Sequence, residues 1–250
     1  MLDNTTLQNL AHNKEIDKYS LLREYLQIKF LNQFYKNKQL IKTYFKGGTA
    51  IKLIYNSSRF SEDLDFTTLM PLNKLKTILA KIVKELNSEF DQLTIKKLKT
   101  TQGYSAKLYL PIDFAPQPLT IKLDFSTRES ILKPISSPLT TDLPIHLITI
   151  VDHLSKKELL AEKIRAILHR NKGRDVFDLW YLLHIKTEFQ IKFINEKLKF
   201  YNESYCQSKL INKIKSFPQK TIDQDVRQFL PKSERKIIPE LKRLILEKII

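Results

Sequence analysis

Residues 44–66, YFKGGTAIKLIYNSSRFSEDLDF, place a Gly-Gly pair shortly before a cluster of acids in a chain that is poor in glycine and strongly basic. Gly47 and Gly48 are two of only four glycines in 250 residues, and Asp63 and Asp65 follow two positions apart. Residues at that spacing on a strand point to the same face, so the two carboxylates would lie side by side. Anions that close raise each other's pKa unless a cation lies between them. The spacing therefore predicts a site for Mg²⁺, which takes carboxylate oxygens and leaves positions for phosphate oxygens.

A third acid, Asp124, lies in the segment LTIKLDFST, where apolar and polar residues alternate as on a strand. Three carboxylates allow two metal ions about 3.5–4 Å apart, one activating the attacking hydroxyl and one holding the leaving pyrophosphate. We therefore predict Asp63, Asp65 and Asp124 as metal ligands, with Asp124 acting alternatively as the base for the acceptor proton. Taken alone, Asp124 would be an exposed strand residue.

The Gly-Gly pair falls between a β-prone run, 43–45, and a segment of good helix formers, 50–55. A strand–Gly-Gly–helix turn lets the backbone approach a ligand and aims helix N-terminal N–H groups at phosphate. Thr49 would either cap this helix or donate its hydroxyl to a phosphate oxygen. Lys52 and Arg59 would add positive charge where a triphosphate lies.

The elements that must position these residues fall into two groups. Hydrophobic periodicity predicts helices over 16–37 and 71–90 and strands over 93–98, 104–110 and 119–126. From Ser155 onward the pattern predicts helices only, over 156–170, 175–184, 190–201, 207–215 and 235–250. The fold class predicted is α/β (α+β), with a core domain over 1–150 and a helical C-terminal lobe over 151–250 that completes the active site.

The formal net charge of +16 is spread along the chain. Residues 1–150 hold 21 Lys and Arg against 14 Asp and Glu, and residues 151–250 hold 22 against 13. This excess indicates either a coding bias toward lysine or a polyanionic partner such as nucleic acid. The single cysteine excludes an internal disulfide framework. No segment resembles a signal peptide or a membrane span, so we expect a cytoplasmic protein that does not enter a membrane.

The order Gly-Gly, then Ser61-x-Asp63-x-Asp65, then Asp124 resembles the polymerase-β-type nucleotidyltransferase superfamily. A second stretch, ELLAEKIRAILHRNKGRDVFDLWYL over 158–182, is similar to the other hallmark of the AbiEii/AbiGii family of abortive-infection toxins. In that family a helix carrying Glu-Lys precedes an Arg-Asp-x-x-Asp segment. The resemblance covers roughly residues 40–185.

The resemblance implies a polymerase-β-like mixed sheet flanked by helices, followed by a helical C-terminal lobe. It implies that the two glycines hold the triphosphate and that Asp63 and Asp65 bind Mg²⁺. Lys163 and Asp178 would be further active-site residues, with Lys163 touching phosphate. The remaining residues that we predict to contact or support the nucleotide are Thr49, Lys52, Ser61, Arg174 and Asp175.

The second stretch also has a purely structural interpretation. Arg174 and Asp178 are four residues apart and would form a surface ion pair on a helix, with Asp175 as the helix cap. Gly173 would end the preceding helix.

Together, these features predict Mg²⁺-dependent transfer of a nucleoside monophosphate from an NTP to a hydroxyl of an RNA acceptor. The resemblance and the charge point to the tRNA 3′ end, and to a toxin neutralised by a separately encoded antitoxin. One alternative is a nucleotidyltransferase that modifies a small molecule such as an aminoglycoside. Another is a non-catalytic protein that binds nucleotide or RNA.

Aromatic and basic residues alternate in the tail. Tyr201 and Tyr205, interleaved with Lys197, Lys199 and Lys209, would stack bases in an RNA groove or belong to a packed helix face.

Overall fold

The computed structural model describes residues 2–36, 42–147 and 149–249, which form two compact units. We call them the sheet unit and the helical unit. The sheet unit comprises the chain up to Asn56, then Phe60–Glu129 and Pro134–His153. The helical unit comprises Ser57–Arg59, Ser130–Lys133 and the chain from Leu154 onward. Two short segments that the predicted division at residue 150 assigns to the core domain therefore belong to the helical unit.

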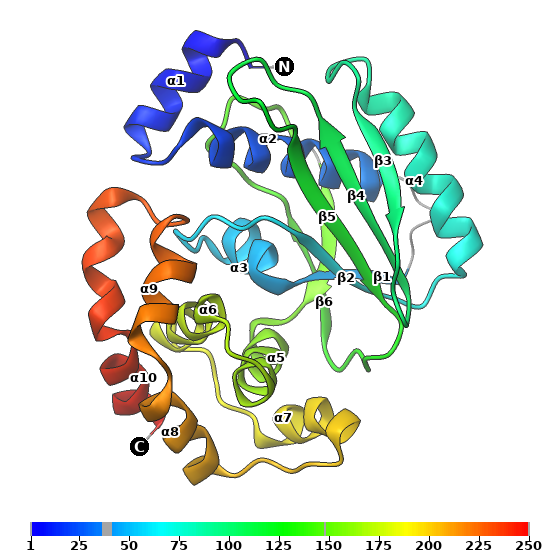
Figure 1. Ribbon diagram of the computed structural model, residues 1–250. Coiled ribbons are helices and arrows are strands. Elements are labelled where there is room, and N and C mark those ends of the chain that lie inside the picture. Colours follow the sequence, from blue (N-terminus) through cyan, green and yellow to red (C-terminus); the bar gives the residue numbers. More distant parts are fainter. Residues whose placement is uncertain (1, 37–41, 148, 250) are drawn as a thin grey trace. The chain divides into compact units, whose positions relative to one another are not determined.

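The sheet has seven strands within the described residues, in the order β3–β4–β5–β2–β1–β7–β6 (Figure 1). It is mixed, because β1 pairs antiparallel with β2 and parallel with β7, whereas β2 pairs parallel with β5. Strand β4 is antiparallel to both β3 and β5. The strand bounds are β1 Thr43–Lys46, β2 Leu64–Thr68, β3 Thr94–Leu98, β4 Tyr104–Leu110, β5 Leu119–Ser126, β6 Pro134–Pro138 and β7 Ile150–Leu154.

One face of this sheet is apolar, and phenylalanine rings cross it. Phe45 pairs with Phe66, and Phe66 with Phe125, so the three rings lie in one row across β1, β2 and β5. The rings of Phe66 and Phe125 stack with centroids 4.7 Å apart, and Phe34 of helix α2 packs 5.0 Å from Phe66. Burying each such side chain contributes about 1.5–3 kcal/mol, so this row stabilises the central strands against α2.

The helices of the sheet unit, within the residues that the structure describes, are α1 Asn4–Asn13, α2 Lys18–Lys36, α3 Gly47–Tyr55 and α4 Leu72–Leu86. Helix α2 is buried around most of its circumference and contacts β5 and α4. Helix α4 buries Leu75, Ile78, Leu79, Ile82, Val83 and Leu86, the stripe expected from its 3.6-residue period.

The helical unit contains α5 Lys156–His169, α6 Gly173–His184, α7 Ile191–Leu198, η2 Lys199–Tyr201, α8 Gln207–Ser216, α9 Gln219–Arg227, η3 Lys232–Glu240 and α10 Leu241–Ile249. Helix α6 contacts α5, α9 and α10. Gly173 permits the close approach to α9, since a Cβ there would lie 2.6 Å from the Ile222 Cα. Among the described residues, no helix combines the length and the apolar character needed to cross a bilayer.

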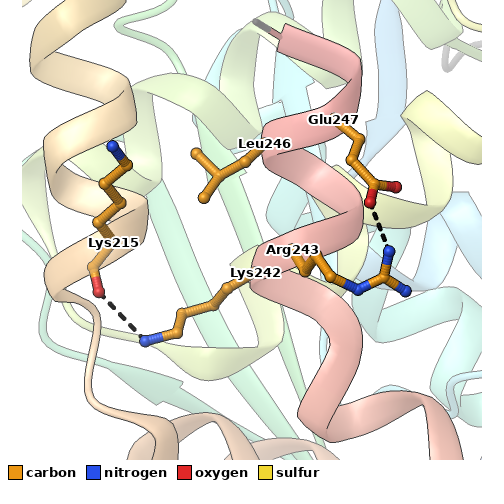
Figure 2. A pocket seen from close by; sticks show the side chains of 5 residues that line it. All are labelled: Lys215, Lys242, Arg243, Leu246 and Glu247. Atoms are coloured by element: carbon orange, nitrogen blue, oxygen red, sulfur yellow. Dashed lines mark hydrogen bonds and ion pairs between the residues drawn. The ribbon is translucent and has the colours of Figure 1, made fainter.

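A shallow pocket lies between α8 and α10 of the helical unit (Figure 2). The Lys242 ammonium donates hydrogen bonds of 3.1 Å to the carbonyl oxygens of Lys215 and Phe217, which end helix α8. Arg243 pairs with Glu247 on the same helix (Figure 2). Lys242 therefore caps the C-terminal end of α8, and the pair of Arg243 and Glu247 stabilises α10.

The predicted fold class, a mixed sheet flanked by helices, is confirmed, and strands 104–110 and 119–126 have the predicted bounds. The prediction missed α1, α9, β6 and β7. Strand β6 has proline at both ends and three residues between them, and β7 has five residues, so neither carries a usable period. The prediction that Gly173 ends the preceding helix is wrong, because Gly173 is the first residue of α6. The predicted helix ends at Asn37 and Ile250 lie outside the described residues.

Candidate active site

A row of polar residues crosses four strands on the face opposite the phenylalanine row. Lys46 of β1 pairs with Asp65 of β2, Asp65 with Asp124 of β5, and Asp124 with Ser105 of β4. We call these four residues the carboxylate row. Partners in register point to the same face, so the carboxylates of Asp65 and Asp124 lie on neighbouring strands, side by side. The Ser105 hydroxyl is buried there without a hydrogen-bond partner.

Gly47 follows Lys46 directly and makes room for the Asp65 carboxylate. Its φ is +78°, in the left-handed region that favours glycine, and helix α3 begins at this residue. A Cβ at Gly47 would lie 2.2 Å from Oδ2 of Asp65. The Gly-Gly turn therefore brings the start of a helix, with its free N–H groups, against a carboxylate of the row.

The segment that leads to Asp65 is held through its backbone. Gln27 of α2 donates from Nε2 to the carbonyl oxygens of Ser61 and Glu62, at 3.0 and 3.1 Å. The Thr49 hydroxyl donates to the carbonyl oxygen of Asp63. Thr49 lies within helix α3, two residues after its start, so the predicted capping role is wrong. Its predicted contact with phosphate, like that of Ser61, stays a prediction.

Lys122 adds an ammonium group that the sequence analysis did not single out. It lies two residues before Asp124 on β5, and its Nζ is 2.7 Å from Oδ2 of Asp124. Partial burial lowers the pKa of Lys122. The hydrogen bond to Asp124 and the charges of Asp124, Asp63 and Asp65 raise this pKa by more than burial lowers it, so the net shift is upward. The alternation of polar residues in LTIKLDFST places this lysine on the face of Asp124 and was the available signal.

Lys46 belongs to the carboxylate row itself and was also missed. Its side chain is buried and forms an ion pair with Glu129, at the end of the segment after β5. Lys52, predicted to lie near phosphate, has its Nζ 3.4 Å from Glu24 of α2 and 4.1 Å from the centre of the Phe60 ring. Its contacts are thus with the core helix α2 and the segment after α3.

The side chains present suit a divalent metal held jointly with a substrate. Asp65 and Asp124 are adjacent in register, and the missing side chain of Gly47 lets the Asp65 carboxylate lie against the start of α3. Within residues 2–36, 42–147 and 149–249, however, no group of three or more His, Cys, Asp or Glu side chains is placed to hold a metal ion. Mg²⁺ in nucleotide sites is typically bound by one or two carboxylates together with phosphates, and the row has that composition.

The second sequence motif forms a cluster of buried charges in the helical unit. The Lys163 ammonium lies 2.9 Å from Asp175 and 2.7 Å from Asp178. Arg59 donates from Nε and Nη2 to the two oxygens of Asp178, at 2.9 and 3.0 Å, and Arg170 pairs with Asp175. We call Arg59, Lys163, Asp175 and Asp178 the buried charge cluster, and Arg170 is an exposed partner at its edge. Planar guanidinium–carboxylate pairs of this kind are directional as well as strong.

This cluster corrects two predictions. Asp178 is 1% exposed and bound by Arg59 and Lys163, so the alternative of a surface pair with Arg174 is wrong. Arg174 is half-buried, with its guanidinium 5.9 Å from the centre of the Phe229 ring. Arg59, which we expected beside a triphosphate, is almost fully buried against Asp178. The roles predicted for Lys163, Asp178 and Arg174 in nucleotide binding stay predictions.

The acidic and the basic side chains of the cluster stabilise each other's ionised forms, as the pKa shifts of Asp178 and Lys163 show. Burial raises the pKa of Asp178, but the charges of Arg59 and Lys163 lower it by more, so it falls below its usual value. Burial lowers the pKa of Lys163, and the charges of Asp175 and Asp178 raise it above its usual value. Asp178 and Lys163 are therefore both ionised near neutral pH.

We expect Gly47→Ala to lower the free energy of unfolding by at least about 1–2 kcal/mol, because a left-handed backbone disfavours a side chain and the Asp65 carboxylate must move. Urea unfolding of the full chain measures this. Asn56, at the other end of α3, also has positive φ, +60°, and Asn56→Gly is the matched control that should cost little. A free energy of unfolding for Gly47→Ala equal to that of the wild type would contradict the close approach of Gly47 to the Asp65 carboxylate.

We expect Asp178→Asn to cost about 3–5 kcal/mol near neutral pH, because it breaks a buried ion pair and leaves Arg59 under-compensated. Since the pKa of Asp178 is lowered on folding, its contribution is complete above the unfolded value of 3.8 and is lost as pH falls through the folded pKa. The difference between wild type and variant should therefore be constant around neutrality and shrink in acid. Urea unfolding across a pH series tests this.

The exposed pair of Arg227 and Asp223 on α9 supplies the control, and Asp223→Asn should barely change stability at any pH. A wild-type advantage over Asp178→Asn that grows as pH falls below 3.8 would contradict the charge assignment of the cluster.

Solved structures that resemble this chain in fold over most of its length include MenT4 and JHP933. MenT4, a nucleotidyltransferase toxin from Mycobacterium tuberculosis H37Rv, matches with a TM-score of 0.63 at 15% identity, covering 99% of this chain and 90% of MenT4. JHP933 from Helicobacter pylori matches with a TM-score of 0.60 at 21% identity, covering 94% and 93% of the two chains. No curated protein matches the sequence.

The sequence also matches a protein family over most of its length. Residues 29–244 fit the family described as nucleotidyl transferase AbiEii toxin, type IV toxin–antitoxin system. This range includes the carboxylate row, the Gly-Gly turn and the buried charge cluster. Such membership implies a nucleotidyltransferase that uses an NTP and has a cognate antitoxin. The chain belongs to the AbiEii nucleotidyltransferase toxin family.

Proposed function

We propose that this nucleotidyltransferase moves a nucleoside monophosphate from an NTP to a hydroxyl of an RNA acceptor, the 3′ end of tRNA, and releases pyrophosphate. In this proposal it is the toxin of an abortive-infection system and acts in the cytoplasm, where NTP and tRNA are abundant. The observation that carries the proposal is the pairing of Asp65 with Asp124 beside the Gly47 turn.

In the proposed site Asp63 and Asp65 bind Mg²⁺, and Asp124 is a third ligand or accepts the proton of the attacking hydroxyl. The metal supplies positive charge to the triphosphate and to the oxygens of the leaving pyrophosphate. Gly47 and Gly48 let the phosphates approach the free N–H groups at the start of α3. Lys122 places a positive charge 2.7 Å from the Asp124 carboxylate.

An RNA acceptor is supported by the net charge of +16, which favours a polyanion over a cationic drug. It is also supported by an aromatic surface in the helical unit. Phe200 and Tyr201 are 52% and 36% exposed, and the Tyr201 ring stacks on His169 with centroids 3.6 Å apart. Rings of this kind stack on unpaired bases regardless of sequence.

Cations gather around these rings. Burial lowers the pKa of His169; the charge of Glu203 opposes that shift, whereas Lys209, Arg165 and Lys213 lower the pKa further. Two residues of the predicted base-stacking set are engaged elsewhere. Lys197 is buried against Glu158, and Tyr205 packs edge-on against Phe189. The proposed RNA surface therefore consists of His169, Phe200, Tyr201, Lys199, Lys209, Lys213 and Arg165.

The activity test uses the purified full chain with total tRNA, Mg²⁺ and each α-labelled NTP in turn. We expect label on tRNA with a preferred NTP, and at least about a 100-fold loss in Asp65→Asn, because that change removes charge needed only with metal and triphosphate bound. Asp223→Asn, which alters a surface carboxylate of the helical unit that pairs with Arg227, is the matched control and should retain activity.

Label on an aminoglycoside and none on tRNA would instead support the small-molecule alternative. Binding of nucleotide or RNA without transfer to either acceptor would support a non-catalytic protein. Equal transfer by wild type and Asp65→Asn would contradict the assignment of the carboxylate row.

We expect Phe200→Ala to weaken tRNA binding by about tenfold, since stacking on one base contributes about 1–3 kcal/mol. NTP binding should not change. Fluorescence anisotropy with labelled tRNA at fixed salt measures the effect. Ile191→Ala is the control, because Ile191 is an equally exposed apolar residue, 54%, of the same unit without a ring. Equal loss in both variants would contradict base stacking.

A further inference from the structure

Two short segments of the chain belong to the helical unit, although they come before Leu154, where the continuous part of that unit begins. Residues 57–59 and 130–133 belong to the helical unit, although both are flanked by sheet-unit residues. The first segment precedes Asp63, and the second follows Asp124 and Glu129. We call them crossing segments. The first lies ahead of β2 and the second lies after β5, and each of these strands bears a residue of the carboxylate row.

The first crossing segment is held by Asp178. Arg59 makes two hydrogen bonds, of 2.9 and 3.0 Å, to the Asp178 carboxylate, and both side chains are almost fully buried. Lys163 holds the same carboxylate from within the unit, at 2.7 Å. The next residue in the chain, Phe60, lies under the Lys52 ammonium of the sheet unit. Arg59 is thus held by contacts within the helical unit, and the next residue, Phe60, is held by a contact within the sheet unit.

The second crossing segment is held in the same way by Glu158. Its two carboxylate oxygens accept from the backbone N–H groups of Leu132 and Lys133, at 3.0 and 2.8 Å. Lys197 bridges this carboxylate, at 2.7 Å, to the carbonyl oxygen of Ser130, at 2.8 Å. Glu158 is fully buried, and the preceding Glu129 is bound to Lys46 of the sheet unit.

Each buried carboxylate thus holds backbone or an arginine of a crossing segment on one side and a lysine of its own unit on the other. A lone buried carboxylate would be costly, and removing either partner would leave an unpaired charge. Alternative positions of the crossing segments are therefore disfavoured as long as the carboxylates are present.

We propose that Asp178 and Glu158 are positioning residues, which hold the crossing segments 57–59 and 130–133 and thereby fix the chain on either side of the carboxylate row. On this view Asp178 acts through Arg59, and its effect on activity arises from the position of the chain that leads to Asp63. The consequence for catalysis rests on the proposed function, whereas the anchoring itself does not.

Hydrogen–deuterium exchange of the full chain, followed by mass spectrometry, tests the anchoring directly. Asp178→Asn should speed exchange over residues 57–63 by about tenfold or more and leave 130–133 near the wild-type rate, because local opening exposes only the released amides. Glu158→Gln should do the reverse. Arg59→Lys keeps the charge but lacks the planar fork, so it should reproduce the effect of Asp178→Asn over 57–63.

Asp223→Asn is the matched control, since it removes a carboxylate paired with arginine on α9 and should leave both segments unchanged. If Asp178→Asn fails to fold, Arg59→Lys decides the first segment and Glu158→Gln the second. Unchanged exchange over 57–63 in folded Asp178→Asn and Arg59→Lys would overturn the proposal.

The exchange experiment tests the anchoring and the transfer assay tests the proposed function, so a negative result in one does not decide the other. If wild type transfers no nucleotide to any acceptor, the proposed function falls while the exchange pattern still decides the anchoring. If Asp178→Asn loses transfer while exchange over 57–63 stays at the wild-type rate, Asp178 acts on the substrate itself and the positioning role is wrong.

Discussion

The pleat of the central strands is the constraint on which the candidate site depends. Alternate residues of a strand must face opposite sides, so packing Phe45, Phe66 and Phe125 against the core forces their neighbours onto the other face. Those neighbours are Lys46 and Asp65 on β1 and β2, and both Asp124 and Ser126 on β5. A slip of one residue in any of these pairings would bury a carboxylate and expose a phenylalanine, so the hydrophobic core sets the register of the polar row.

Charge is treated differently in the two units. In the sheet unit, the side chains of Asp65 and Asp124 are half-buried, and Asp124 pairs with Lys122. In the helical unit, Asp178 and Glu158 are withdrawn from solvent and fully matched by Arg59, Lys163 and Lys197. Buried pairs of this kind add little net stability compared with apolar packing, but they are intolerant of change. Their value here is in specifying where the crossing segments lie.

This arrangement gives the two hallmark motifs of the family a physical connection. The first motif runs from the Gly-Gly turn to Asp65 and contains Arg59 within it. The second motif contains Lys163 and Asp178, which receive Arg59 in the helical unit. Residues far apart in the chain are thereby tied through one guanidinium group, and the second motif can influence the first without contacting a substrate.

By itself, the sequence determined several of the local elements and predicted a carboxylate site in the first motif. The alternation in LTIKLDFST and the period of α4 predicted their structures, and the spacing of Asp63 and Asp65 after two glycines predicted a carboxylate site, because these patterns are local. Tertiary structure alone decided the partners. The register that sets Asp65 beside Asp124, and the burial that turns Arg59 from a loop cation into the partner of Asp178, depend on residues more than 50 positions away. Spacing along a chain carries no information on such contacts, because they are selected by core packing and by the cost of leaving a buried charge unpaired.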